Sequence, residues 1–160
     1  MEDSLNKKIS IRLANELDVE QIKYIIKQSF VDYCNVIGID TVEALEEGEK
    51  EILHDITKKF VYVACLEDLI IGSVRVDIKG GRTFVSRFAT LPEYQSLGVG
   101  SELLSYVENV LANANVSVID LYSAVDNVKL KDFYISKGYT IVSIDDKKGY
   151  KRGLFQKEIH

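Results

Sequence analysis

The sequence predicts an α/β fold with a mixed, mostly antiparallel central sheet and helices on both faces. β-rich runs and helical periodicities follow one another in the order β-α-α-β-β-β-α-β-α-β-β. This order contains one βαβ unit, in the second half of the chain, and hairpin-like pairs of strands surround it. A regular doubly wound sheet repeats the βαβ unit, so the order favours a mixed sheet instead.

The first third of the chain predicts one strand and two helices. The strand is Ile9–Ala14, and Asp18 is the expected N-cap of a helix that runs to about Tyr33. That helix is indicated by four apolar residues at helical spacing, which are Ile22, Ile25, Ile26 and Phe30. Thr41 is the expected cap of a second helix, Val42–Lys58, which carries many glutamates.

The remaining chain predicts six strands and two helices. The strands are Phe60–Leu66, Ile70–Ile78, Arg82–Leu91, Val116–Ser123, Tyr139–Ile144 and Gly153–Ile159. A helix over Val99–Ala114 follows from apolar residues that share one face. A shorter helix begins at Asp126 or Asn127 and ends near Gly138, a residue type that often terminates helices.

The length and composition are those of one globular domain, which we expect to span residues 1–160. The 160 residues are 46% hydrophobic and 28% charged, and a chain of this length can bury a core without disulfides or metal ions. The formal net charge is −5. This charge disfavours nucleic acid as a partner, because binding to phosphates needs a cationic face.

The sequence also predicts a cytoplasmic protein that contacts no membrane. The segment Met1–Lys8 is polar and of mixed charge, unlike a signal peptide. No apolar run approaches the roughly 18 residues of a membrane-spanning helix. Cys34 and Cys65 lack the spacing of a zinc site, so we expect two free thiols and no metal.

A loop with two glycines, Pro92–Ser101, joins a predicted strand to a predicted helix. Gly98 and Gly100 let the backbone turn tightly and approach a ligand without Cβ clashes. The first N–H groups of a helix have no intrahelical partner, and with the helix dipole they favour a phosphate. The loop therefore predicts a pyrophosphate site that needs no basic side chain.

Two other phosphate-binding motifs fit this loop less well. A P-loop needs a lysine after the last glycine, but Ser101-Glu102 follows Gly100. In a dinucleotide-binding fingerprint the strand runs directly into the first glycine, whereas six residues, 92–97, intervene here. Leu103 also stands in place of the third glycine, although Asp120 lies where a ribose-binding acid is expected. A loop that only turns the chain is the remaining alternative.

The pattern Gln95-x-x-Gly98-x-Gly100, after a strand and a proline turn, closely resembles the coenzyme A motif of the GNAT acetyltransferase superfamily. That motif is Gln/Arg-x-x-Gly-x-Gly/Ala. Basic residues often accompany it in the family, whereas Ser96 and Leu97 stand in those places here.

A second segment strengthens the resemblance, because it is similar to the family's Asn-x-x-Ala-x-x-x-Tyr-x-x-x-Gly-Phe/Tyr pattern. Asn127, Tyr134, Gly138 and Tyr139 match in type and spacing, and Leu130 departs from the usual alanine. Asn127 and Tyr134 are seven residues apart, so they share one face of a helix. A tyrosine at such a position can also be a core residue with its hydroxyl at the surface.

The resemblance implies that acetyl-CoA is the co-substrate and that it lies between two splayed parallel strands, Arg82–Leu91 and Val116–Ser123. It assigns coenzyme A contacts to twelve residues, which are Phe88, Ala89, Thr90, Gln95, Ser96, Leu97, Gly98, Val99, Gly100, Ser101, Asn127 and Tyr134. It also implies a small-molecule or peptide amine as the acceptor, and it is compatible with a homodimer.

The implied chemistry is direct attack of a primary amine on the thioester. Such an amine has a pKa of about 10 and must lose a proton before it attacks. The resemblance assigns Tyr134 as the general acid on the leaving thiolate. No base can be named, because the strand Arg82–Leu91 has no carboxylate and His54 fits a solvated helix face. A non-catalytic acyl-CoA sensor and a longer acyl group stay open.

The charge pattern gives conflicting indications about the acceptor. The predicted second helix carries six acidic residues that could hold a cationic amine, which are Glu43, Glu46, Glu47, Glu49, Glu51 and Asp55. A solvated helix face is the commoner explanation of such charges. The last hairpin carries four cations, which are Lys147, Lys148, Lys151 and Arg152. These favour an acidic or neutral acceptor, so the sequence supports only a primary amine.

Overall fold

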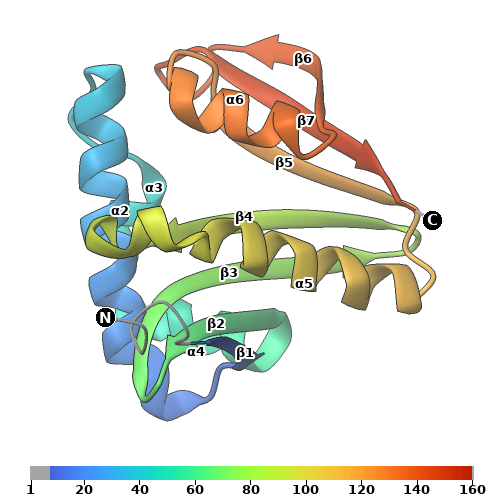
Figure 1. Ribbon diagram of the computed structural model, residues 1–160. Helices are drawn as coiled ribbons and strands as arrows, with labels where there is room; N and C mark the ends of the chain where they lie inside the picture. Colours follow the sequence, from blue (N-terminus) through green and yellow to red (C-terminus); the bar gives the residue numbers. More distant parts are fainter. Residues whose placement is uncertain (1–7, 160) are drawn as a thin grey trace.

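Seven strands form one sheet in the computed structural model, which describes residues 8–159 (Figure 1). Apart from Lys8, the polar segment Met1–Lys8 lies outside these residues. The strand order is β1-β2-β3-β4-β5-β7-β6. Strands β4 and β5 are parallel, and every other neighbouring pair is antiparallel. The predicted mixed, mostly antiparallel sheet is confirmed.

The element bounds agree with the sequence-based expectations at most positions. The strands are β1 (Ile9–Leu13), β2 (Phe60–Leu66), β3 (Leu69–Lys79), β4 (Arg82–Thr90), β5 (Val118–Ala124), β6 (Thr140–Asp145) and β7 (Arg152–Glu158). The α-helices are α2 (Val19–Ile37), α3 (Glu43–Glu46), α4 (Glu49–Lys58), α5 (Val99–Asn113) and α6 (Val128–Ser136). Two 3-10 helices precede α2 and α5, which are η1 (Glu16–Asp18) and η2 (Pro92–Leu97).

Helices cover both faces of the sheet, as the sequence predicts. Helix α5 lies in front of β3 and β4 in Figure 1, where its Leu103 lies against Gly72. Arg75 points to the opposite face of β3, because side chains alternate along a strand, and there it meets Asp55 of α4. Helix α2 packs against α4, β3 and β4, and α6 packs against β5. One continuous apolar core joins these layers.

The second helix is divided, so the prediction of one helix over Val42–Lys58 is wrong. Helix α3 ends at Glu46, Glu47 is extended, and Gly48 is the N-cap of α4. The N–H of Gly48 donates to Glu51 Oε2 at 3.0 Å, which completes the cap. The break at Glu47 turns its side chain toward the sheet, where it pairs with a buried arginine.

That arginine is Arg75, whose side chain is only 2% exposed. It donates hydrogen bonds to Glu47 and, at 2.9 Å, to Asp55. A buried charge is tolerated only when partners compensate for its lost hydration. Burial raises the pKa of Asp55, but attraction to Arg75 and Lys59 outweighs this effect, so the pKa is lower than usual. The ion cluster therefore fixes α3 and α4 to the sheet.

Replacing Arg75 by Met should destabilise the fold by about 3–5 kcal/mol, because two buried carboxylates lose their partner. Urea unfolding at pH 7 measures this difference. The pKa of Asp55 is depressed in the folded chain, so its contribution is complete above about pH 4 and is lost as the pH falls further. The gap between Arg75→Met and the unaltered protein should therefore narrow in acid.

Lys79→Met is the matched control, because it removes a cation from the same strand. The Lys79 side chain is 81% exposed, and its nitrogen lies 3.7 Å from Asp77. Exposed pairs contribute about 0–1 kcal/mol. Equal losses in the two variants would contradict a special role for the buried cluster.

Candidate functional site

The parallel strands β4 and β5 pair over a short stretch and then separate. The register joins only Arg82 to Val118, Thr83 to Ile119 and Phe84 to Asp120. The buried carboxylate of Asp120 closes this end, because it accepts hydrogen bonds from Arg82 at 2.7 Å and 3.2 Å and from Gln156 at 2.8 Å. Beyond it, residues of both strands line a cavity of about 890 Å³.

This cavity brings together eight of the twelve residues predicted to contact coenzyme A. They are Phe88, Thr90, Gln95, Gly98, Gly100, Ser101, Asn127 and Tyr134. The other four do not line it. Ala89 and Val99 are buried in the core, and Ser96 and Leu97 are exposed on η2.

The glycine loop places the first turn of α5 at the cavity. Gly98 adopts a left-handed conformation with φ of 76° and is the N-cap of α5, without a side-chain cap. A Cβ on Gly100 would lie 3.1 Å from Cζ of Phe88, so this glycine permits the ring to pack closely. The first amide groups of the helix are therefore positioned to meet an anion in the cavity.

Strand β4 has a bulge where it borders the cavity. Arg87 and Phe88 lie opposite the single residue Val74, and Arg87 has a φ of 50°. Such a conformation costs a non-glycine residue about 1–3 kcal/mol. The bulge interrupts the ladder at both residues, and both line the cavity. Nothing in the residue types of this strand predicts it.

Tyr134 lines the cavity from α6, although its side chain is largely buried. Its ring packs in an aromatic cluster with Phe88, Phe133, Tyr139 and Phe155, at centroid distances of 5.4–6.0 Å. Burial, and to a lesser degree the nearby Tyr33, raises the pKa of Tyr134 well above its usual value. The phenol is therefore protonated at neutral pH and can donate a hydrogen bond.

Asn127 combines a structural position with a place in the site. Its side chain is the N-cap of α6 and accepts a hydrogen bond from the N–H of Leu130 at 3.3 Å. It also lines the cavity. Asn127 and Tyr134 thus line the same cavity, in agreement with the common helix face that their spacing predicts.

Tyr33 is a site residue that the sequence does not reveal. Its hydroxyl accepts a hydrogen bond of 2.7 Å from the N–H of Ala124, at the end of β5. Its ring lies 6.4 Å from that of Tyr150, and both residues line the cavity. Burial, followed by the proximity of Tyr150, raises the pKa of Tyr33. The contact joins residues 91 positions apart, so no local pattern could indicate it.

Charged side chains of both signs line the other end of the cavity. Of the six predicted acidic residues, Glu43 and Glu46 line it, and Lys148 and Arg152 of the last hairpin do too. Glu47, Glu51 and Asp55 instead pair with Arg75 or cap α4. The Lys148 ammonium donates a hydrogen bond to Glu43 and links the β6–β7 loop to α3.

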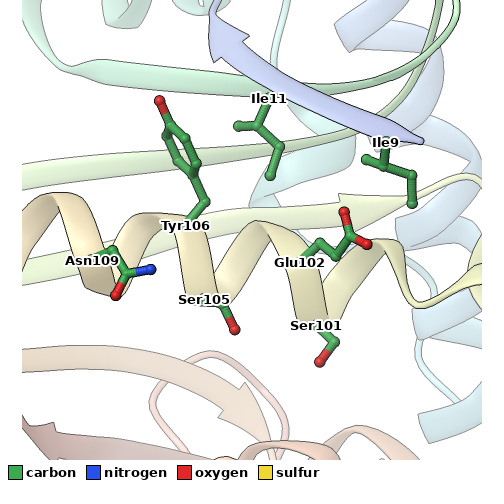
Figure 2. Close-up of a pocket in the computed structure, with 7 residues that line it drawn as sticks. All are labelled: Ile9, Ile11, Ser101, Glu102, Ser105, Tyr106 and Asn109. Carbon is green, nitrogen blue, oxygen red and sulfur yellow. The ribbon is translucent and has the colours of Figure 1, made fainter.

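A smaller hollow of about 380 Å³ lies between β1 and α5 (Figure 2). Ser101, Ser105 and Asn109 follow one another along α5 beside it, and Ser101 also lines the large cavity. Of these three residues, only Ser101 lies in the first turn of α5 and borders the large cavity.

The sequence profile of the Acetyltransferase (GNAT) family matches residues 24–139. The chain belongs to this family. It is therefore an enzyme, a GNAT-type acyl-CoA N-acyltransferase. No curated protein sequence matches the chain as a relative.

Solved GNAT structures share this fold. PaiA N-acetyltransferase from Thermoplasma acidophilum, in complex with coenzyme A, is 20% identical with a TM-score of 0.82, over 94% of this chain and 99% of that chain. The ribosomal-protein-S18-alanine N-acetyltransferase of Escherichia coli is 14% identical with a TM-score of 0.78, over 95% and 94%. Ard1 from Thermoplasma volcanium is 16% identical with a TM-score of 0.78, over 95% and 98%.

Within the part of the chain that the structure describes, we searched for membrane-spanning helices, metal sites and disulfides. No helix within residues 8–159 is long and apolar enough to span a membrane. The same residues contain no group of three or more His, Cys, Asp or Glu side chains that could hold a metal ion. Cys34 and Cys65 are both buried free thiols.

Replacing Tyr33 by Phe should leave the Ala124 N–H without its partner. Loss of this hydrogen bond should speed exchange of the Ala124 amide by about tenfold or more, because an unpaired buried donor costs about 1–3 kcal/mol. Amide hydrogen exchange followed by NMR measures this rate. Tyr24→Phe, at an exposed position of the same helix, should leave the rate unchanged. Equal exchange in both variants would show that Tyr33 does not hold this strand end.

Proposed function

We propose that the enzyme transfers an acetyl group from acetyl-CoA to a primary amine by direct attack within the cavity between β4 and β5. The observation that carries this proposal is the meeting of three features in one space. These are the first turn of α5, the bulge of β4 and the side chain of Tyr134. Each suits a different part of a thioester substrate.

The first turn of α5 suits the pyrophosphate of coenzyme A. Its free amide groups and the positive end of the helix dipole both favour an anion. A bulge leaves its extra residue unpaired, so peptide groups of Arg87 and Phe88 would be available to the pantetheine arm. The likeness to the Thermoplasma acidophilum enzyme in complex with coenzyme A supports this placement.

Replacing Ser101 by Glu should weaken binding of acetyl-CoA by about tenfold or more without unfolding the protein. An acidic residue in the first helical turn stabilises a helix, so the fold is preserved while the pyrophosphate is repelled. Calorimetric titration with acetyl-CoA measures the affinity. Gly100→Val is a poorer test, because its side chain would collide with Phe88.

Ser105→Glu is the matched control, since it adds the same charge one turn further along α5 (Figure 2). Ser105 does not line the large cavity. Unchanged affinity in Ser101→Glu, with the fold intact, would contradict the placement of the pyrophosphate at this helix end.

The reaction forms a bond between the amine nitrogen and the acyl carbon and breaks the bond from that carbon to sulfur. The amine gives up one proton to solvent water, and the sulfur leaves as a thiolate. A thiol has a pKa of about 8.5, below that of a phenol. Because burial raises the pKa of Tyr134 further, its hydroxyl serves by donating a hydrogen bond as the negative charge develops on sulfur.

Replacing Tyr134 by Phe should lower kcat by about 10²–10⁴-fold and leave acetyl-CoA affinity nearly unchanged. The ring and its packing are kept, and only a donor that matters in the transition state is lost. Steady-state release of coenzyme A measures kcat, and calorimetry measures affinity. Tyr106→Phe, at an exposed position on α5, is the control. Wild-type turnover in Tyr134→Phe would show that the Tyr134 hydroxyl does not stabilise the leaving thiolate.

A further inference from the structure

Three cations surround Glu43 at one end of the cavity, which we assign to the acceptor and call the acceptor end. Arg87 comes from β4, Lys148 from the β6–β7 loop and Arg152 from β7, and all three line the cavity. They share one carboxylate, that of Glu43. The hydrogen bond from Lys148 and, more weakly, attraction to Arg87 and Arg152 lower the pKa of Glu43. Glu43 thus stands in a site whose surroundings favour a negative charge.

Both arginines keep unused hydrogen-bonding capacity. Nε of Arg87 lies 3.6 Å from Glu47, and a terminal nitrogen of Arg152 donates to Asp145 at 3.1 Å. The Arg152 guanidinium also lies 3.8 Å above the Tyr122 ring, which fixes its plane. Both side chains remain partly exposed, 24% for Arg87 and 15% for Arg152, so part of each guanidinium is open to a ligand. A guanidinium has five donors in a planar fork that matches a carboxylate, so a ligand carboxylate would use this capacity.

Glu43 is weakly held in this position. Its side chain is 64% exposed, and that of its partner Lys148 is 44% exposed. Ion pairs with such exposure contribute little to stability, because water and salt screen them. Glu43 can therefore swing out of the cavity at little cost, whereas Arg87 and Arg152 are held by carboxylates outside the site.

The other acidic residues that line the cavity are not paired with these three cations, and a further cation, Lys129, lines the cavity as well. Asp32, Glu46 and Asp126 are all exposed, and among residues 8–159 none of them forms an ion pair with the three cations. With Glu43 displaced, the acceptor end carries three cations. A polyamine or another polycation would meet like charges there, which is unfavourable.

We propose that the acceptor amine carries a carboxylate, and that this carboxylate takes the place of Glu43 between Arg87, Lys148 and Arg152. The acceptor class is thus an amino acid or a similar amino acid-like compound. This inference rests on the proposed function, because it assigns the acceptor of the same cavity. In the absence of the acceptor, the Glu43 carboxylate occupies this position, and the acceptor carboxylate displaces it.

The direct test compares free amino acids with their amides as acceptors. Each pair has the same side chain, so the pairs differ in the carboxylate and in the pKa of the amine. The assay of coenzyme A release is therefore run at several pH values at which Lys148 keeps its charge, and each kcat/KM is divided by the unprotonated fraction of the amine. We expect the amino acids to have kcat/KM values about tenfold or more above those of their amides and of spermidine. Equal or better turnover of the amides or of spermidine would overturn the inference.

Charge-removing variants test the site itself. Lys148→Gln and Arg152→Gln should raise the KM for amino acids by about 10- to 100-fold, because each removes a charged hydrogen bond to the carboxylate. Glu43→Gln should lower the same KM several-fold, since the competing charge is gone. The KM for acetyl-CoA should not change. The controls are Lys147→Gln and Glu49→Gln, which remove the same charges next to the site but outside the cavity. A rise in the KM for amino acids after Glu43→Gln would contradict the inference that Glu43 competes with the acceptor carboxylate.

A binding measurement separates this inference from the proposed function. N-acetyl amino acids, which have the shape of the products, are titrated by calorimetry into protein saturated with coenzyme A. Binding that Lys148→Gln weakens and Lys147→Gln does not would support the carboxylate site even if no amine turned over. Absence of turnover with every amine would then contradict the proposed reaction alone. No binding of these products, together with turnover of uncharged amines, would overturn the carboxylate site alone.

Discussion

Strands β4 and β5 run parallel and share a register over three residue pairs, from Arg82 to Phe84 on one strand and from Val118 to Asp120 on the other. Because the strands are parallel, their carboxyl ends lie at the same edge of the sheet, and each is followed by a helix. The N-cap of α5, Gly98, and the N-cap of α6, Asn127, therefore both line one cavity. Antiparallel strands would place these two helix starts at opposite edges. The rest of the site depends on this pairing and on its early end.

A chain of charges connects the core to this cavity. Asp55 and Glu47 bind the buried Arg75, and Glu47 also lies 3.6 Å from Arg87 at the bulge. The extended conformation of Glu47 that this requires ends α3. Glu43, on the short helix before it, then lies at the cavity, opposite the β6–β7 loop. An ion cluster that fixes α4 to the sheet thus also determines which charges reach the acceptor end.

The features that could be predicted from the sequence are those set by neighbouring residues. The glycine loop follows from Gly98 and Gly100, and the common face of Asn127 and Tyr134 follows from their spacing. The division of the second helix does not follow from the sequence in this way, because a glycine such as Gly48 costs a helix only about 1 kcal/mol and need not end it. Arg75, 28 residues away from Glu47, contributes the interaction that favours the break.

The site features that the sequence does not predict also depend on contacts between residues far apart in the chain. The hydrogen bond from Ala124 to Tyr33 spans 91 residues, and the ion pair of Lys148 with Glu43 spans 105. The sequence does not indicate the positive φ of Arg87 either, since arginine has no preference for that conformation. The spacing of apolar residues indicates only local structure. These contacts cannot be inferred from it, because they form only when the sheet brings distant segments together.

Tyr134 shows why a core position and a site position need not exclude each other. Its ring fills an aromatic cluster with Phe88 and Phe155, so the side chain has little freedom to rotate. A phenol has one polar atom at the end of an apolar ring, so it can be buried in a core while its hydroxyl faces a cavity. In the proposed reaction a donor held in this way needs no reorganisation when charge develops on sulfur, which is the condition under which electrostatic stabilisation is strongest. The packing that raises the pKa of Tyr134 would then also orient its proton, and both effects follow from burying the ring beside the open end of β4 and β5.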